Sequence, residues 1–239
     1  MSEKLLISDS DKNKLVSDYK SRYSEFGYSP KTLGWDKGKQ DLRFEVLTSQ
    51  WDIEGKRILD LGCGFGDLNR FLKNKGIDNY EYVGVDLVDD LISEAKERNS
   101  NNGKAKINYI CEDFLTYSSM DTYDYVISSG PFNRKFTGEL DNYTFIQRCM
   151  DKSFDLCREG IAFDFLSDKV DFQYEHTFHS SPEKILGMAY KKSRNVILRN
   201  DYMPFEFALF IFKDDSFDKK DTVFCRYRES SKISYTRKV

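Results

Sequence analysis

The sequence predicts an α/β protein with a Rossmann-like, doubly wound sheet of seven strands that is mostly parallel and carries a helical lid at its N-terminal end. Two observations support this fold class. Apolar runs of strand length alternate with stretches of helical periodicity, and a glycine-rich turn follows the first run. Such alternation is typical of a parallel sheet covered on both faces. The last two runs have no room for a helix between them, so the last strand is expected to be antiparallel.

The order of these runs also divides the chain. Strands are expected at 57–61, 82–85, 107–111, 125–128, 161–166, 196–198 and 205–212. Helices are expected at 3–26, 40–50, 67–74, 89–99, 141–157 and 182–190. We therefore expect three parts, namely a helical lid at 1–50, the sheet domain at 51–213 and a charged tail at 214–239.

Composition limits the classes of protein that fit. The chain has 239 residues, 39% of them hydrophobic and 32% charged, with a net charge of -3. This composition favours a soluble protein, a monomer or homodimer, with neither a membrane span nor a surface that attracts nucleic acid. The five cysteines form no CxxC pair. Their number and spacing favour a reducing compartment, the cytoplasm, and give no indication of a metal site.

The glycine-rich turn predicts a ligand site. Glycines at 62 and 64 let a ligand approach the backbone, and the turn presents a helix N-terminus to that ligand. The third glycine position of a dinucleotide fingerprint is Asp67. Its charge would repel a pyrophosphate, whereas a ligand carrying an ammonium and a sulfonium would be accepted. Asp67 and the antiparallel ending thus weigh against a rival reading, an NAD-dependent dehydrogenase. Asp86, at the end of the second run, is placed to accept hydrogen bonds from ribose hydroxyls.

Four motifs together resemble those of class I S-adenosylmethionine (SAM)-dependent methyltransferases. They are LDLGCGFG at 59–66, VGVD at 83–86, CEDF at 111–114 and YDYVI at 123–127, and the resemblance covers about 40–213. It implies SAM as the cofactor, with the adenine amine at Asp113. The residues expected at the cofactor are Trp35, Arg43, Asp60, Gly62, Cys63, Gly64, Asp67, Asp86, Leu87, Asp113, Phe114 and Ser129. Trp35 is expected to cover the cofactor, and Arg43 to pair with its carboxylate.

The segment after the fourth strand indicates the acceptor. Ser129-Gly130-Pro131-Phe132 stands where nucleobase and glutamine N-methyltransferases carry an Asn/Asp-Pro-Pro-aromatic tetrad, so those acceptors are disfavoured. The arrangement resembles small bacterial enzymes that methylate small metabolites, often sugars of surface polysaccharides. The residues expected to bind a small-molecule acceptor are Phe132, Asn133, Arg134, Lys135 and Tyr174.

Methyl transfer to a hydroxyl releases a proton, for which a base is useful. His176 and His179, the only histidines, both follow the fifth strand and are expected on the ligand side. We therefore predict a SAM-dependent O-methyltransferase acting on a small polar or anionic metabolite, with a histidine as the base. Two alternatives remain open at this point. One is an N-methyltransferase for an amino sugar or another small amine, and the other is a non-catalytic SAM-binding module.

Overall fold

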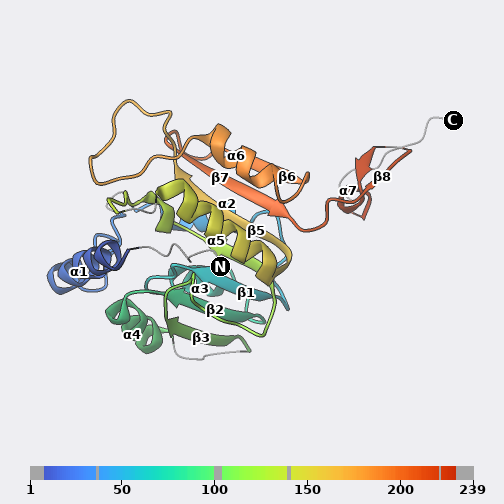
Figure 1. The fold of residues 1–239 in the computed structure, drawn as a ribbon. Helices are drawn as coiled ribbons and strands as arrows, with labels where there is room; N and C mark the ends of the chain where they lie inside the picture. The colour runs from blue at the N-terminus through green and yellow to red at the C-terminus, as the bar shows by residue number, and fades with distance from the viewer. Residues whose placement is uncertain (1–7, 36–37, 100–103, 139–140, 221, 230–239) are drawn as a thin grey trace.

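A seven-stranded sheet forms the centre of the protein in a computed structural model that describes residues 8–35, 38–99, 104–138, 141–220 and 222–229 (Figure 1). The strand order is β3-β2-β1-β4-β5-β7-β6. The strands are β1 (Arg57–Leu61), β2 (Glu81–Asp86), β3 (Lys106–Cys111), β4 (Tyr123–Ser128), β5 (Cys157–Leu166), β6 (Val196–Arg199) and β7 (Glu206–Phe212). All seven lie where the sequence predicts them, which confirms the predicted fold class.

The direction of β7 also matches the prediction. Strands β1 to β5 pair in parallel, and β7 runs antiparallel to both β5 and β6. Because β7 runs the other way, it begins at the edge where the parallel strands end. Glu206, its first residue, therefore pairs with Leu166 at the end of β5.

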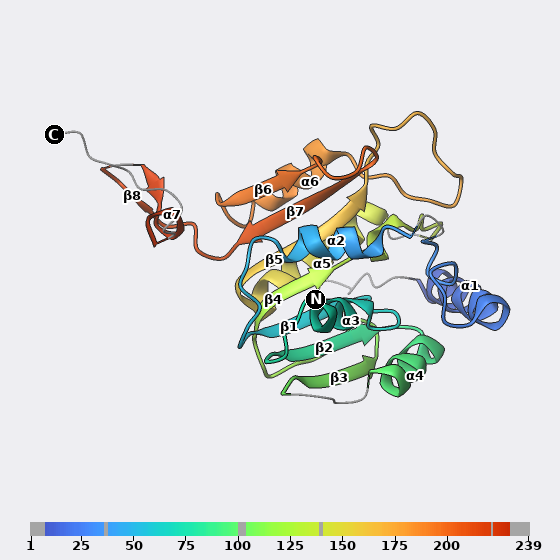
Figure 2. The same cartoon turned by 180° about the vertical axis from the view of Figure 1, so that it is seen from behind.

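Helices cover both faces of the sheet (Figures 1 and 2). They are α1 (Asp9–Phe26), α2 (Gln40–Thr48), α3 (Asp67–Asn74), α4 (Asp89–Arg98), α5 (Asn142–Leu156) and α6 (Pro182–Tyr190). Successive residues of a strand point to opposite faces. Thus Leu59 belongs to the apolar cluster under α5 and α6, whereas its neighbour Ile58 belongs to the cluster under α2 and α3. Strand β7 is buried throughout, as expected of a strand covered on both faces.

The two ends of the chain add smaller elements. At the N-terminal end, α1 and α2 fall within the predicted lid, of which residues 1–7 and 36–37 lie outside the described residues. The predicted charged tail contains a short hairpin of β8 (Phe217–Asp218) and β9 (Val223–Phe224), followed by α7 (Cys225–Glu229). This hairpin stands away from the sheet (Figure 1). Among the described helices, none has both the length and the apolar character that crossing a bilayer requires.

Candidate active site

A cavity of about 1070 Å³ lies at the carboxyl ends of the parallel strands. Its walls come from the segments that follow β1 to β5, from α1 and from the loop between α1 and α2. This edge is where open α/β sheets bind their ligands. The residues predicted for function that line it are Trp35, Arg43, Asp60, Gly62, Cys63, Gly64, Asp86, Leu87, Asp113, Phe114, Ser129, Asn133, Arg134, Tyr174, His176 and His179.

The glycine-rich turn forms one wall of this cavity. Gly62 and Gly64 have φ values of 69° and 52°, a region that favours glycine. A Cβ on Gly62 would lie 2.2 Å from Cγ of Pro131, and one on Gly64 would lie 3.2 Å from Leu33. The turn is thus held between the segment after β4 and the loop after α1. Only glycine at 62 allows Pro131 to come this close.

Asp86 ties the end of β2 to this turn. Its Oδ2 accepts a hydrogen bond from the Gly64 N–H at 2.9 Å, and its Oδ1 accepts one from the Val88 N–H at 3.0 Å. Burial raises the pKa of Asp86, while the backbone N–H groups act in the opposite direction. A carboxylate oxygen can accept a further hydrogen bond, so Asp86 can also receive two hydroxyl donors from a ligand in the cavity.

Asp113 is contacted by the lid helix. Its Oδ1 accepts a hydrogen bond from the Leu115 N–H at 2.9 Å, and its Oδ2 forms an ion pair with Nζ of Lys12 on α1. Phe114, beside it, is buried and stacks with Tyr117. The acid that the resemblance assigns to adenine is therefore held by a lysine from α1.

Helix α1 is also attached to the loop that follows β4. Asp11 accepts hydrogen bonds from the N–H groups of Thr137 and Gly138, at 3.1 and 2.9 Å. Burial raises the pKa of Asp11, but these hydrogen bonds and one from Ser8 hold it below its ordinary value. Further along α1, Asp18 forms an ion pair with Arg134. Through these contacts α1 bridges the cofactor end and the acceptor end of the cavity.

A buried carboxylate lies behind Ser129. The Ser129 hydroxyl donates to Oδ2 of Asp164 at 2.5 Å, and the Gly130 N–H donates to Oδ1 at 2.8 Å. Asp164 is 1% exposed, and burial raises its pKa to about 6. Sequence reasoning did not single out this residue. The sequence nevertheless carries a signal for it, because Asp164 is an acid inside the apolar run of β5. A polar group at such a position needs a buried partner.

Arg43 has a partner within the protein. Its Nε donates to Oε2 of Glu206 at 2.6 Å and its Nη2 forms an ion pair with Oε1, both side chains being buried. The guanidinium also lies 4.0 Å from the ring centroid of Trp35. Trp35 in turn packs against Gly130, where a Cβ would lie 2.5 Å from its ring. The charge that the sequence assigns to a cofactor carboxylate is thus already paired with Glu206.

Three of the predicted residues do not line the cavity. Phe132 is 1% exposed and packs against Phe163 and Phe165 in the core. Asp67 accepts a hydrogen bond from the Tyr28 hydroxyl at 2.9 Å. Lys135 contributes its backbone N–H to the carbonyl of residue 176 at 3.1 Å, and its side chain is absent from the cavity wall. These residues shape the wall from behind.

The two histidines differ in their contacts. His179 is fixed through both ring nitrogens, Nδ1 lying 2.7 Å from the Ser167 carbonyl and Nε2 lying 3.0 Å from the Thr177 hydroxyl. His176 is exposed and lies 5.7 Å, centroid to centroid, from the tilted ring of Tyr174. The structure therefore leaves His176 freer than His179 to meet a ligand.

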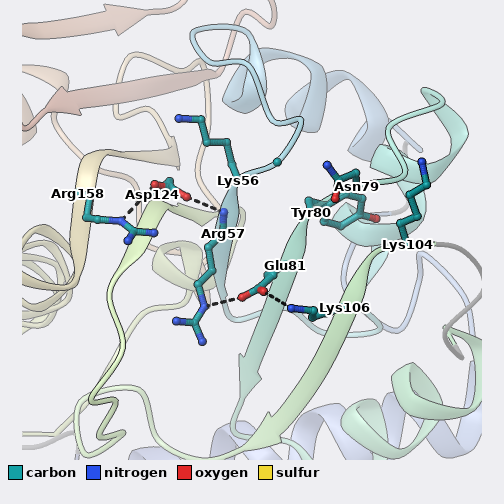
Figure 3. Close-up of a pocket in the computed structure, with 10 residues that line it drawn as sticks. Lys56, Arg57, Asn79, Tyr80, Glu81, Lys104, Lys106, Asp124 and Arg158 are labelled. Atoms are coloured by element: carbon teal, nitrogen blue, oxygen red, sulfur yellow. Dashed lines mark hydrogen bonds and ion pairs between the residues drawn. The ribbon is translucent and has the colours of Figure 1, made fainter.

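A second, smaller pocket of about 370 Å³ lies at the opposite edge of the sheet (Figure 3). It is rich in charge, but its charges are largely paired with one another. Glu81 contacts both Arg57 and Lys106, and Asp124 contacts Arg158, as the dashed lines in Figure 3 show. These pairs lie at the amino ends of the strands, and of the sequence motifs described above only YDYVI at 123–127 contributes to them, through Asp124. We assign no function to this pocket.

Comparison with known proteins agrees with the fold and the motifs. Residues 58–151 match the model of a family described as a methyltransferase domain. A tRNA1(Val) (adenine(37)-N6)-methyltransferase of Bacteroides thetaiotaomicron is 30% identical over 90 residues, which cover 36% of this chain and 38% of that protein. A ubiquinone biosynthesis O-methyltransferase of Coxiella burnetii is 35% identical over 72 residues, covering 30% and 29%. The aligned part is thus well under half the length of either relative.

Solved structures extend the likeness to most of the chain. The magnesium protoporphyrin IX methyltransferase of Synechocystis, solved with bound S-adenosylhomocysteine (SAH), gives a TM-score of 0.60 at 12% identity and covers 85% of this chain and 99% of that one. The N-methyltransferase NodS of Bradyrhizobium japonicum, also in complex with SAH, gives 0.55 at 13% identity, covering 82% and 97%. Together with the family match, these structures confirm the resemblance to class I SAM-dependent methyltransferases.

Proposed function

We propose that this chain transfers a methyl group from SAM to a hydroxyl of a small polar or anionic metabolite, such as a sugar, a sugar nucleotide or a phosphate-bearing precursor of a surface polysaccharide. One observation carries the proposal. A single cavity is lined both by the predicted cofactor residues and by the loops that follow β4 and β5. A cofactor and an acceptor bound there would lie in the same cavity, which methyl transfer requires.

The residues present fit SAM as the cofactor. The glycine turn offers open backbone, Asp86 offers free lone pairs for ribose hydroxyls, and Asp113 offers a carboxylate for an amine once Lys12 gives way. The cofactor supplies an activated methyl group, so the chain mainly has to align the acceptor and exclude water. Trp35, packed on Gly130, lines the cavity from the side of the lid and would cover the cofactor.

His176 is the proposed proton acceptor. It lines the cavity from the loop after β5, and its ring is exposed rather than packed. In its neutral form the imidazole would take the proton of the acceptor hydroxyl as the oxygen attacks the methyl carbon. His179, fixed at both nitrogens, would hold the loop in place.

An N-methyltransferase for an amino sugar or another small amine is a second candidate, with which Ser129 is compatible. Its hydroxyl hydrogen is committed to Asp164, so the oxygen presents only lone pairs to the cavity. Such an oxygen suits an amine donor as well as a hydroxyl. The relatives include RNA, ubiquinone and protoporphyrin methyltransferases, so they do not select the acceptor. A small molecule as the partner and a cytoplasmic location are further parts of this proposal.

Calorimetry with SAM, SAH and NAD tests the cofactor. We expect SAM and SAH to bind with micromolar dissociation constants, a binding free energy of about -8 kcal/mol, and NAD not to bind. Binding of NAD without SAM would contradict the whole proposal. Binding of SAM without methyl transfer to any candidate acceptor would instead favour a SAM-binding module.

The Asp86→Ala variant is expected to lose about 1.5–3 kcal/mol of SAH binding, because it removes a charged acceptor of hydrogen bonds. Asp86→Asn, which keeps one acceptor oxygen, should lose less. Asp155→Ala is the matched control, since Asp155 is an exposed acid on α5 that does not line the cavity. Titration of all three by calorimetry is the measurement. Full affinity in a folded Asp86→Ala variant would place the ribose elsewhere.

A further inference from the structure

The cavity is larger than one ligand needs. Pockets for single small molecules occupy about 300–1,000 Å³, and this cavity measures about 1070 Å³. The predicted cofactor residues account for its inner end, below the glycine turn and the ends of β2 and β3. The outer end is lined by α1, by the loop that follows it and by the loop between β5 and α6. The side chains that line the outer end differ in kind from those at the cofactor end.

An arc of aromatic side chains lines the outer end, formed by Phe172, Tyr174 and His176 and called here the aromatic arc. Ring centroids are 4.7 Å apart between Phe172 and Tyr174, and 5.7 Å apart between Tyr174 and His176. Phe172 and Tyr174 are 63% and 59% exposed although they line the cavity. Exposed aromatic rings gathered at one place mark a binding surface, because each leaves apolar area in water. The arc therefore offers stacking faces for a flat ring.

The loop that carries the arc is hydrogen-bonded to the segment that follows β4. The Phe178 N–H donates to the Asn133 carbonyl at 2.9 Å, and the Lys135 N–H to the His176 carbonyl at 3.1 Å. From these contacts the loop extends beyond the edge of the sheet, on the same side as α1 (Figures 1 and 2). The arc thus lines the same cavity as α1 and the loop after it.

Positive charge on the lid side of the outer end has no carboxylate partner among the described residues. Arg22, Lys31 and Lys39 line the cavity, and none of them forms an ion pair with a carboxylate in the described part of the chain. The acids of the wall gather mainly at the cofactor end, where Asp60, Asp86, Glu112 and Asp113 lie, and only Asp171 lies in the loop of the arc. Three unpaired cations suit a ligand with more than one negative charge.

We propose that the outer end of the cavity binds a nucleoside diphosphate, the carrier of the group to be methylated. Its base would stack on Phe172 and Tyr174 of the aromatic arc, which leaves His176 to the hydroxyl of the attached group. Its phosphates would contact Arg22, Lys31 and Lys39. The attached group would then extend inward, toward the glycine turn. This inference rests on the proposed methyl transfer and selects one acceptor class, because a bare sugar would leave the cations unmatched and a sugar phosphate would leave the arc unused.

Calorimetry on the full chain saturated with SAH tests this site. The probes are UDP, CDP, ADP and GDP, each compared with its own nucleoside, together with inorganic pyrophosphate. We expect at least one diphosphate to bind about tenfold or more tightly than both its nucleoside and pyrophosphate, since charged hydrogen bonds and base stacking each contribute on that scale. If no diphosphate exceeds its nucleoside, or if pyrophosphate binds equally well, the proposal is wrong.

Variants separate the two halves of the site. Arg22→Gln and Lys31→Gln should weaken the diphosphate about tenfold each and leave the nucleoside unchanged. Phe172→Ala should weaken both ligands by a similar factor. The matched controls are Lys106→Gln at the opposite edge and Tyr190→Ala, an exposed aromatic outside the cavity wall. Equal losses in the controls would overturn the assignment.

The SAH titration of each variant keeps the two proposals apart. Retained SAH affinity shows that the variant is folded and that the cofactor end is intact. If the wild-type chain fails to bind SAH, the proposed function fails. If it binds SAH but behaves toward the diphosphates as toward their nucleosides, only the inference about the outer end fails.

Discussion

Replacing His176 with alanine is expected to lower kcat for hydroxyl methylation by about 10²–10⁴-fold, the usual contribution of a general base. The variant removes the imidazole that would take the acceptor proton, but it leaves the glycine turn and Asp86 untouched. SAH affinity should therefore stay at the wild-type value. The measurement is the initial rate of SAH formation at saturating SAM, with the accepted hydroxyl substrate, as a function of pH.

The His179→Ala variant is the control that distinguishes loss of a general base from a change in the loop. His179 holds the loop through Ser167 and Thr177, so its loss should act on acceptor affinity through a looser loop. We expect a raised KM for the acceptor and a pH profile of wild-type shape. A His176→Ala variant with unchanged kcat would remove the general base from the mechanism. A small effect with an amine acceptor would favour the N-methyltransferase, since an unprotonated amine needs little help from a base.

The Arg43→Met variant is expected to lose about 3–5 kcal/mol of unfolding free energy, because breaking a buried ion pair leaves a buried charge uncompensated. The residue left alone is Glu206, which is 8% exposed at the start of β7. The double variant Arg43→Met with Glu206→Leu should recover most of this loss. Urea unfolding of the two single variants and the double variant gives the coupling energy directly.

Arg199→Met is the surface control for this cycle. Arg199 pairs with Asp201, whose side chain is 65% exposed. Such pairs contribute about 0–1 kcal/mol. Equal losses of unfolding free energy for Arg43→Met and Arg199→Met would mean that water screens the ion pair between Arg43 and Glu206. A double variant as unstable as Arg43→Met alone would mean that the arginine acts mainly by packing against Trp35.

The fold could be predicted because its signals are local. Each strand is a short apolar run, and each helix between them shows its own periodicity. The strand β7 and its direction followed from the absence of a helix between it and β6. The short hairpin of β8 and β9 gave no such signal, because its strands have only two residues each, which is too short to show a period.

The cofactor end was predictable for the same reason, since its residues follow strands within continuous motifs. The sequence could not predict contacts between side chains that lie far apart in the chain. Glu206 meets Arg43 only because β7 runs antiparallel and begins at the ligand edge. Asp164 meets Ser129 because β4 and β5 are neighbours in the sheet. Arg43 was predicted to pair with the cofactor carboxylate because the sequence does not show that Glu206 already pairs with it.

Few buried residues attach α1 to the rest of the protein. Of its described residues only Asp11 is buried, so the helix is held by a few polar contacts and by a small apolar cluster around Phe65. Elements with so little buried surface open locally, without unfolding of the sheet. Because the same helix lines the cavity and bridges its two ends, we expect local opening of α1 to ease the release of a spent cofactor. The residence time of the cofactor would then depend on this helix as well as on the binding site beneath it.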